Sequence, residues 1–166
     1  MTQAAGLPRD ASARVVTVSD RSFAGERPDE SGPLLVSLLT DVGFTVAAPI
    51  VVPDSAGQIV GAIRGGVEDR VDLVVTTGGT GLGPRDATPE ATREVILREA
   101  PGLAEALRQY RRDEIPTTIL SRGVAGIAGA TLIVNLPGSP GAVRDGVAVL
   151  TPVIGHAVAQ LRGGDH

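Results

Sequence analysis

Two short, mainly apolar runs at residues 71–76 and 131–135 constrain the fold of this chain more than any other feature. A strand that faces water on one side alternates apolar and polar residues, whereas a strand covered on both faces is apolar along its length. Both runs therefore predict central strands of a sheet that has helices packed on each side. Their short length and β-branched residues are typical of strands in a parallel sheet.

Strand and helix patterns alternate along the rest of the chain. Pro49 interrupts the second of three further predicted strands, which cover residues 14–19, 45–52 and 124–127. Apolar residues at helical spacing predict helices over residues 34–42, 59–67, 88–100, 103–112, 142–150 and 152–161. This alternation predicts an α/β fold with a mostly parallel sheet and helices on both sides. We expect a single domain over residues 13–162, between flexible tails at residues 1–12 and 163–166.

The composition excludes several kinds of chemistry. The chain has no Cys, and all 15 of its basic residues are Arg. Thiolate metal sites, disulfides, cysteine nucleophiles, phosphate-binding lysines and Schiff bases are therefore excluded. His156 and His166 are too few for a histidine metal cage, and without a G-x-S-x-G motif a Ser-His-Asp hydrolase is not expected. Carboxylates, hydroxyls, guanidinium groups and backbone amides remain.

Charge and hydropathy indicate where the protein acts. A net charge of −4 and only three aromatic residues argue against binding to nucleic acid. No segment reaches the roughly 18 uninterrupted apolar residues of a membrane span. Residues 1–13 contain no apolar signal segment. We therefore expect a cytoplasmic protein that binds neither membrane nor nucleic acid.

A glycine-rich loop follows the first of the two central strands. Four glycines lie within residues 78–83, so backbone amides can approach the oxygens of an anion without intervening side chains. The loop is not a phosphate-binding P-loop, since no Gly-Lys-Ser/Thr follows, and Pro84 occupies the third glycine position of a dinucleotide fingerprint. A plain turn is the alternative interpretation, but Arg85 and Asp86 directly after the glycines favour a binding site.

Three aspartates are predicted to meet at the same edge of the sheet. Asp20, Asp54 and Asp86 each follow a predicted strand, and ligands of parallel sheets bind beyond the carboxyl ends of the strands. Each has a local alternative: Asp20 could form a turn, Asp54 could cap a helix, and Asp86 could complement a helix dipole. Their convergence instead predicts a site for Mg²⁺, which prefers oxygen ligands, and Mg²⁺ beside a glycine loop suits phosphate chemistry.

Hydroxyl and guanidinium groups elsewhere could add contacts to an anion. Ser121 and Arg122 lie together before the predicted strand at residues 124–127, and Ser139 follows the central run at residues 131–135. A surface turn is the alternative interpretation of Ser121 and Arg122.

Taken in order, these segments resemble the signature motifs of one known family. The first motif is TTGGTG at residues 76–81 followed by RDATPEA at residues 85–91. The second is SR at residues 121–122 followed by NLPGSP at residues 135–140. SDR at residues 19–21 and PD at residues 53–54 fit as well. In this order and spacing, over about residues 14–161, the chain resembles the Mog/MoaB family of molybdenum cofactor biosynthesis.

The resemblance implies a fold, an activity and an assembly. The implied fold is a three-layer α/β/α sandwich that binds molybdopterin, and the implied assembly is a homotrimer or hexamer. The implied activity is that of a molybdopterin adenylyltransferase, which uses Mg²⁺ to transfer AMP from ATP to the terminal phosphate of molybdopterin and releases pyrophosphate. The dithiolene of the pterin supplies the sulfur ligands of molybdenum, in agreement with a chain that lacks Cys. A molybdenum-insertion enzyme is an implied partner.

The resemblance also implies which residues act. Asp54 and Asp86 match the two aspartates that the family needs, and we assign them to catalysis and to Mg²⁺. The residues that we assign to binding molybdopterin and nucleotide are Ser19, Asp20, Gly78, Gly79, Thr80, Gly81, Arg85, Ser121, Arg122, Pro137, Gly138, Ser139 and Pro140.

Two alternative functions remain open at this point. The chain could bind molybdopterin, as a MoaB-like protein, without adenylylating it. It could also be a nucleotide-processing domain similar to the one that begins the competence/damage-inducible CinA-like proteins.

Overall fold

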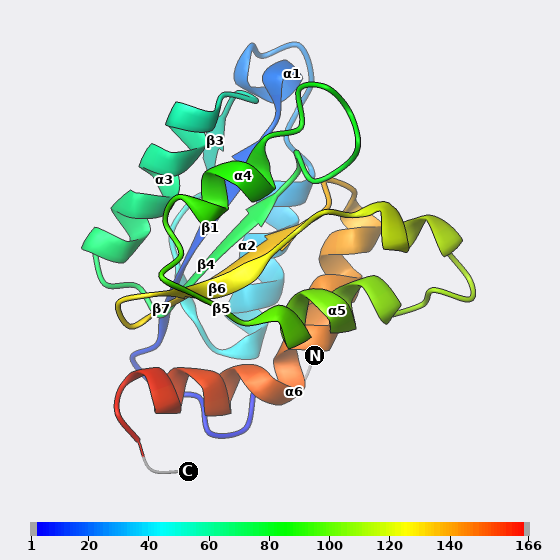
Figure 1. The fold of residues 1–166 in the computed structure, drawn as a ribbon. Coiled ribbons are helices and arrows are strands. Elements are labelled where there is room, and N and C mark those ends of the chain that lie inside the picture. The colour runs from blue at the N-terminus through cyan, green and yellow to red at the C-terminus, as the bar shows by residue number, and fades with distance from the viewer. Residues whose placement is uncertain (1–2, 165–166) are drawn as a thin grey trace.

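Seven strands form one mixed sheet in the computed structural model, which describes residues 3–164 (Figure 1). The strands are β1 (Ser12–Val18), β2 (Thr45–Val46), β3 (Ile50–Val52), β4 (Leu73–Thr77), β5 (Arg98–Glu99), β6 (Ala125–Ala128) and β7 (Thr131–Leu136). Their order across the sheet is β2-β1-β4-β7-β6-β5. Strand β3 also pairs with β1, further along it than β2 does. Strand β1 is parallel to β2, β3 and β4, and β4 is parallel to β7. Strand β6 is antiparallel to both β7 and β5.

Helices cover both faces of the sheet (Figure 1). They are α1 (Asp20–Phe23), α2 (Ser31–Val42), α3 (Ala56–Glu68), α4 (Thr88–Arg93), α5 (Pro101–Gln109), the 3-10 helix η1 (Pro116–Leu120) and α6 (Pro140–Leu161). Helices α2 and α6 pack on one face, and α3 and α4 on the other. The predicted three-layer α/β/α fold is thereby confirmed.

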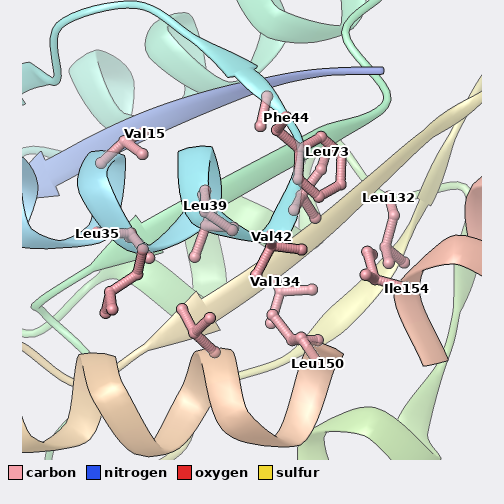
Figure 2. Close-up of a cluster of buried hydrophobic side chains, with 14 of the residues drawn as sticks. Val15, Leu35, Leu39, Val42, Phe44, Leu73, Leu132, Val134, Leu150 and Ile154 are labelled. Atoms are coloured by element: carbon pink, nitrogen blue, oxygen red, sulfur yellow. The ribbon is translucent and has the colours of Figure 1, made fainter. Parts of the chain in front are cut away.

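The central strands are mainly apolar because their side chains enter two separate cores. In β4, Leu73 and Val75 point into the core beneath α2 and α6, which Figure 2 shows, whereas Val74 points into the core beneath α3 and α4. In β7, Val134 and Ile133 are divided between the two cores in the same way. Side chains alternate across a strand, so a strand with a core on each side carries apolar residues on both of its faces.

The register of the parallel strands brings their carboxyl ends to one edge. Thr77, the last residue of β4, pairs with Thr17 of β1 and with Leu136, the last residue of β7. Val18 of β1 pairs with Val52 of β3. The loops after β1, β3, β4 and β7 therefore leave the sheet side by side, as the sequence predicts.

The prediction of a helix over residues 88–100 is wrong in its second half. Helix α4 ends at Arg93, and the chain then pairs with β6 as the short strand β5, starting with the N–H of Leu97, which donates to the carbonyl of Ile127 over 2.9 Å. Pairing with a distant strand outweighs the local helical pattern here.

The two helices predicted over residues 142–150 and 152–161 form one helix, α6, with Pro152 inside it. Proline removes one helical hydrogen bond and kinks a helix, and Figure 1 shows the C-terminal part of α6 turning away from its first part. By length and composition, α6 is the one helix among the described residues that could cross a membrane. One face of α6, with Val143, Val147, Leu150, Ile154 and Val158, is instead buried in the core beside the sheet.

The described part of the expected N-terminal tail packs against the domain. Ala4 and Ala11 are buried in the core beneath α2 and α6, and the N–H of Ala4 donates to the carbonyl of Val42 over 3.0 Å. At the other end, Gly163 and Gly164 donate to carbonyls in the last turn of α6. The remaining tail residues, 1–2 and 165–166, lie outside the described residues.

Candidate functional site

A cavity of about 840 Å³ opens at the edge where the parallel strands end. Most of the residues assigned to the site from the sequence line this cavity: Ser19, Asp54, Gly78, Gly79, Thr80, Gly81, Asp86, Ser121, Pro137, Gly138, Ser139 and Pro140. Three assigned residues, Asp20, Arg85 and Arg122, do not line it. The four strand-end loops and the segment after α5 thus meet around one hollow large enough for a small molecule.

The first two residues of the glycine loop, directly after β4, have no room for side chains. Gly78 and Gly79 have φ angles of +103° and +66°, a region that favours glycine. A Cβ atom at Gly78 would collide with the carbonyl oxygen of Val18, and one at Gly79 would collide with Oγ1 of Thr88. The hydroxyl of Thr88 donates to the carbonyl of Gly78 over 2.9 Å and so ties the loop to α4. The loop therefore presents main chain, without side chains, to part of the cavity.

Asp54 is held by the segment after β1 and does not cap α3, the helix that follows it. Its Oδ2 accepts the N–H of Asp20 over 3.1 Å. The N-cap of α3 is Ser55, whose side chain makes no capping hydrogen bond. The interpretation of Asp54 as the cap of the helix that follows it is therefore wrong; its carboxylate instead accepts the first N–H of α1 and lines the cavity.

Asp54 and Asp86 flank the glycine loop. A Cβ atom at Gly79 would lie 3.3 Å from Oδ1 of Asp54, and one at Gly81 would lie 2.8 Å from Oδ2 of Asp86. Burial raises the pKa of Asp54 above its ordinary value, and the negative charges of Asp20 and Asp86 raise it further. Oδ2 of Asp86 accepts the N–H of Gly83 over 3.0 Å, which closes the loop on itself. The two carboxylates therefore concentrate negative charge beside the main chain of the glycine loop.

A cation is the natural complement of this arrangement. Among residues 3–164, no group of three or more His, Asp or Glu side chains could hold a metal ion by itself. Two carboxylates fit Mg²⁺ nevertheless, because this ion often keeps water and substrate phosphates as its remaining ligands.

Asp20 and Arg85 form an ion pair outside the cavity. Nη2 of Arg85 lies 2.6 Å from Oδ2 of Asp20, and the two side chains are 71% and 38% exposed. They connect α1 to the segment that follows the glycine loop.

Arg122 does not make the expected contact to an anion, because its guanidinium group donates to the carbonyls of Gly81 and Asp86.

The sequence interpretation missed cavity residues in two segments. The segment that leads to α2 contributes Arg27, Asp29 and Ser31, and the segment from α5 to η1 contributes Arg108 and Tyr110. The first segment follows a strand end, which could have indicated it; the second follows no strand and carries no such signal. Arg27 has no hydrogen bond or ion pair with any residue that the structure describes.

Asn135 was also missed as a cavity residue, although it interrupts an apolar strand. Its side chain is buried, and Nδ2 donates to Oγ1 of Thr76 and to Oγ1 of Thr92, each over 2.9 Å. Its Oδ1 accepts the N–H of Val124 over 3.1 Å. A polar residue within an otherwise apolar strand was the available signal.

Comparisons with known proteins agree with this geometry. The family described as "Probable molybdopterin binding domain" matches residues 14–156. The chain is 44% identical over 154 residues to the "Molybdenum cofactor biosynthesis bifunctional protein" of Synechococcus elongatus; the match covers 93% of this chain and 48% of that protein. The chain thus spans about half the length of that relative.

Two further relatives match along most of their length. The "Molybdopterin adenylyltransferase" of Helicobacter pylori is 37% identical over 155 residues, which are 90% of this chain and 86% of that protein. The solved structure of the molybdopterin biosynthesis Mog protein of Mycobacterium ulcerans superposes with a TM-score of 0.87 at 45% identity, over 93% of this chain and 98% of that chain. Because the family match extends over most of the sequence, the chain belongs to the Mog/MoaB family of molybdopterin-binding domains in molybdenum cofactor biosynthesis.

Proposed function

We propose that the chain transfers AMP from ATP to the terminal phosphate of molybdopterin. The observation that carries this proposal is the position of Asp54 and Asp86, which line one cavity beside the glycine loop, Asp54 near Gly79 and Asp86 near Gly81. A cavity with main-chain amides for phosphate oxygens and carboxylates for a cation has the groups that phosphoryl transfer requires. The relative from Helicobacter pylori supports the same activity.

The proposed reaction is a single displacement at phosphorus. An oxygen of the molybdopterin phosphate attacks the α-phosphorus of ATP, a new P–O bond forms, and the bond to the bridging oxygen breaks as pyrophosphate leaves. The N–H of Gly78 already donates to the carbonyl of Leu136 over 3.0 Å, so the amides of residues 79–81, with Thr80, hold pterin or phosphate groups. Ser19 and the loop at residues 137–140 complete the nucleotide pocket. Catalysis then depends on alignment, with no strong base needed.

Asp54 and Asp86 are the residues that would hold Mg²⁺. When bound, the ion would neutralise the charge of the leaving pyrophosphate. The raised pKa of Asp54 is consistent with this role, since the same crowding of negative charge that raises it favours a bound cation.

The test is pyrophosphate release from purified protein with molybdopterin, ATP and Mg²⁺, together with mass spectrometry of the adenylylated product. We expect Asp86→Asn to lower the rate by on the order of 100-fold. Asp41→Asn is the matched control, because Asp41 is exposed on α2 and does not line the cavity. Undiminished adenylylation and unchanged binding in Asp86→Asn would contradict the assignment.

The same assay separates the two alternatives. A protein that binds molybdopterin but releases no pyrophosphate is a binding protein, and one that hydrolyses nucleotide without molybdopterin is a nucleotide-processing domain. Both results would contradict adenylyl transfer.

We also propose the assembly, partner and location that family membership implies: a homotrimer or hexamer in the cytoplasm that supplies a molybdenum-insertion enzyme. Light scattering of the purified protein tests the number of copies.

A further inference from the structure

Arg122 does not line the cavity but forms hydrogen bonds with the main chain of the glycine loop and of the residues just after it. Its N–H donates to the carbonyl of Thr80 over 2.8 Å, and its Nε donates to the carbonyl of Gly81 over 2.7 Å. Its Nη2 donates to the carbonyl of Asp86 over 2.9 Å. Arg122, in the segment before β6, therefore bonds three carbonyls in residues 80–86, which lie far earlier in the chain.

Glu90 fixes the guanidinium group of Arg122 from the opposite side. Nη1 of Arg122 donates to Oε1 of Glu90, in the first turn of α4. The ion pair lowers the pKa of Glu90 below its ordinary value, mainly through this hydrogen bond. A guanidinium group is a rigid planar fork, so a carboxylate on one side and two carbonyls on the other set its orientation.

Few other contacts hold this part of the loop. Apart from bonds within the loop, no other described residue forms a hydrogen bond with the main chain between Thr80 and Asp86. The Arg85–Asp20 ion pair lies on the surface, where such pairs contribute little. The side chain of Arg122 is only 33% exposed and its bonds are charge-assisted, so they are the stronger constraint.

We propose that Arg122 is a positioning residue, which sets the place of the Asp86 carboxylate through the main chain of the loop. The inference rests on the proposed adenylyl transfer, in which Asp86 acts on the phosphate end of the nucleotide. Arg122 acts here through Gly81 and the carbonyl of Asp86, and it does not bind an anionic group of the substrate. A misplacement of about 1 Å at a reacting group can lower a rate by on the order of 100-fold.

The first measurement needs no substrate. Hydrogen–deuterium exchange of the peptide that contains residues 79–87 should become faster in Arg122→Gln than in the parent protein. Glu90→Gln keeps the guanidinium group but weakens its orientation, so it should give an intermediate increase. Arg64→Gln is the control and should change nothing, because Arg64 is an exposed arginine on α3 that does not line the cavity. Unchanged exchange in Arg122→Gln would overturn the proposal.

The second measurement separates positioning from substrate binding. We expect Arg122→Gln to lower kcat by about 10- to 100-fold while KM for molybdopterin changes little. Arg122→Lys should restore only part of the rate, because an ammonium group cannot bond two carbonyls and a carboxylate in one plane. A raised KM with an unchanged kcat would instead make Arg122 a substrate contact and overturn the proposal.

A double-mutant cycle tests whether Arg122 acts through Asp86. In the Asp86→Asn background, the further change Arg122→Gln should lower the residual rate by less than about 2-fold, because the group that it positions is already absent. Full additivity of the two effects would overturn the proposal. If the parent protein releases no pyrophosphate at all, adenylyl transfer fails, and the exchange of the loop still decides whether Arg122 holds it.

Discussion

Asp20 and Asp54 exchange hydrogen bonds: the N–H of Asp20 donates to Oδ2 of Asp54 over 3.1 Å, and the N–H of Asp54 donates to Oδ1 of Asp20 over 2.9 Å. The two residues follow β1 and β3, which are neighbours in the sheet. The exchange fixes both loops and leaves Oδ1 of Asp54 without a hydrogen bond from any described residue. Asp54 is therefore oriented before a ligand binds, as a preorganised site requires.

The charge of Asp54 should reduce stability while it serves function. Asp54→Asn is expected to abolish adenylyl transfer and to raise the melting temperature at pH 7 in the absence of metal. Burial and two nearby carboxylates raise the pKa of Asp54 above 3.8, so the ionised form is disfavoured in the folded state. Asn keeps an oxygen that can accept the N–H of Asp20, so little else changes.

The size of this effect depends on pH. An acid with a raised folded pKa costs no stability below its unfolded pKa, and the cost appears as pH rises through the folded pKa. The difference in melting temperature between Asp54→Asn and the parent should therefore be near zero at about pH 3.5 and positive at about pH 7. A variant that is less stable than the parent at neutral pH would contradict this prediction.

Gly78→Ala should destabilise the protein, whereas Gly61→Ala should not. A methyl group at Gly78, where φ is +103°, would meet the carbonyl of Val18 in a central strand that cannot move aside. We expect a loss of more than about 1 kcal/mol of unfolding free energy. Gly61 lies inside α3, where a methyl group would have nothing within 4 Å, so alanine there should add about 1 kcal/mol. Urea unfolding of both variants measures the difference, and equal stabilities would refute the loop geometry.

Arg162 should contribute strongly to stability through Asp72. Its Nε and Nη2 donate to the two carboxylate oxygens of Asp72 over 2.7 and 2.9 Å, and Asp72 is only 5% exposed. Arg162→Met removes the charged partner of a buried carboxylate, which then keeps only the N–H of Ser12, and should cost about 3 kcal/mol in urea unfolding. Asp72→Asn added to Arg162→Met should recover part of that loss. Arg64→Met, at an exposed position, should stay within about 0.5 kcal/mol of the parent.

More of the fold could be predicted from the sequence than of the hydrogen bonds at the site. Strands that are mainly apolar on both faces indicate a sheet covered on both sides, and this local pattern predicts β4 and β7 correctly. The end of α4 at Arg93 could not be predicted, because it depends on pairing with β6, much later in the chain. Periodicity carries no information about such distant partners.

The same limit applies to individual side chains. An Asp before a helix has the same local sequence whether it caps the helix or bonds a loop 34 residues away, as Asp54 does. Arg122 is likewise indistinguishable, from its neighbours alone, from an arginine that faces a ligand. Sequence motifs can thus select the residues of a site, whereas their division into ligand contacts and supports depends on three-dimensional packing.

The cluster of Arg162, Asp72 and Asp10 lies at the edge of the sheet opposite the cavity. Asp72 directly precedes β4, and Arg162 and Asp10 belong to the last and first parts of the described chain. Both ends of the described chain are therefore fastened on the side away from the strand-end loops. An affinity tag or a surface linkage at either terminus should leave the mouth of the cavity open, so the immobilised protein can be used to measure substrate binding directly.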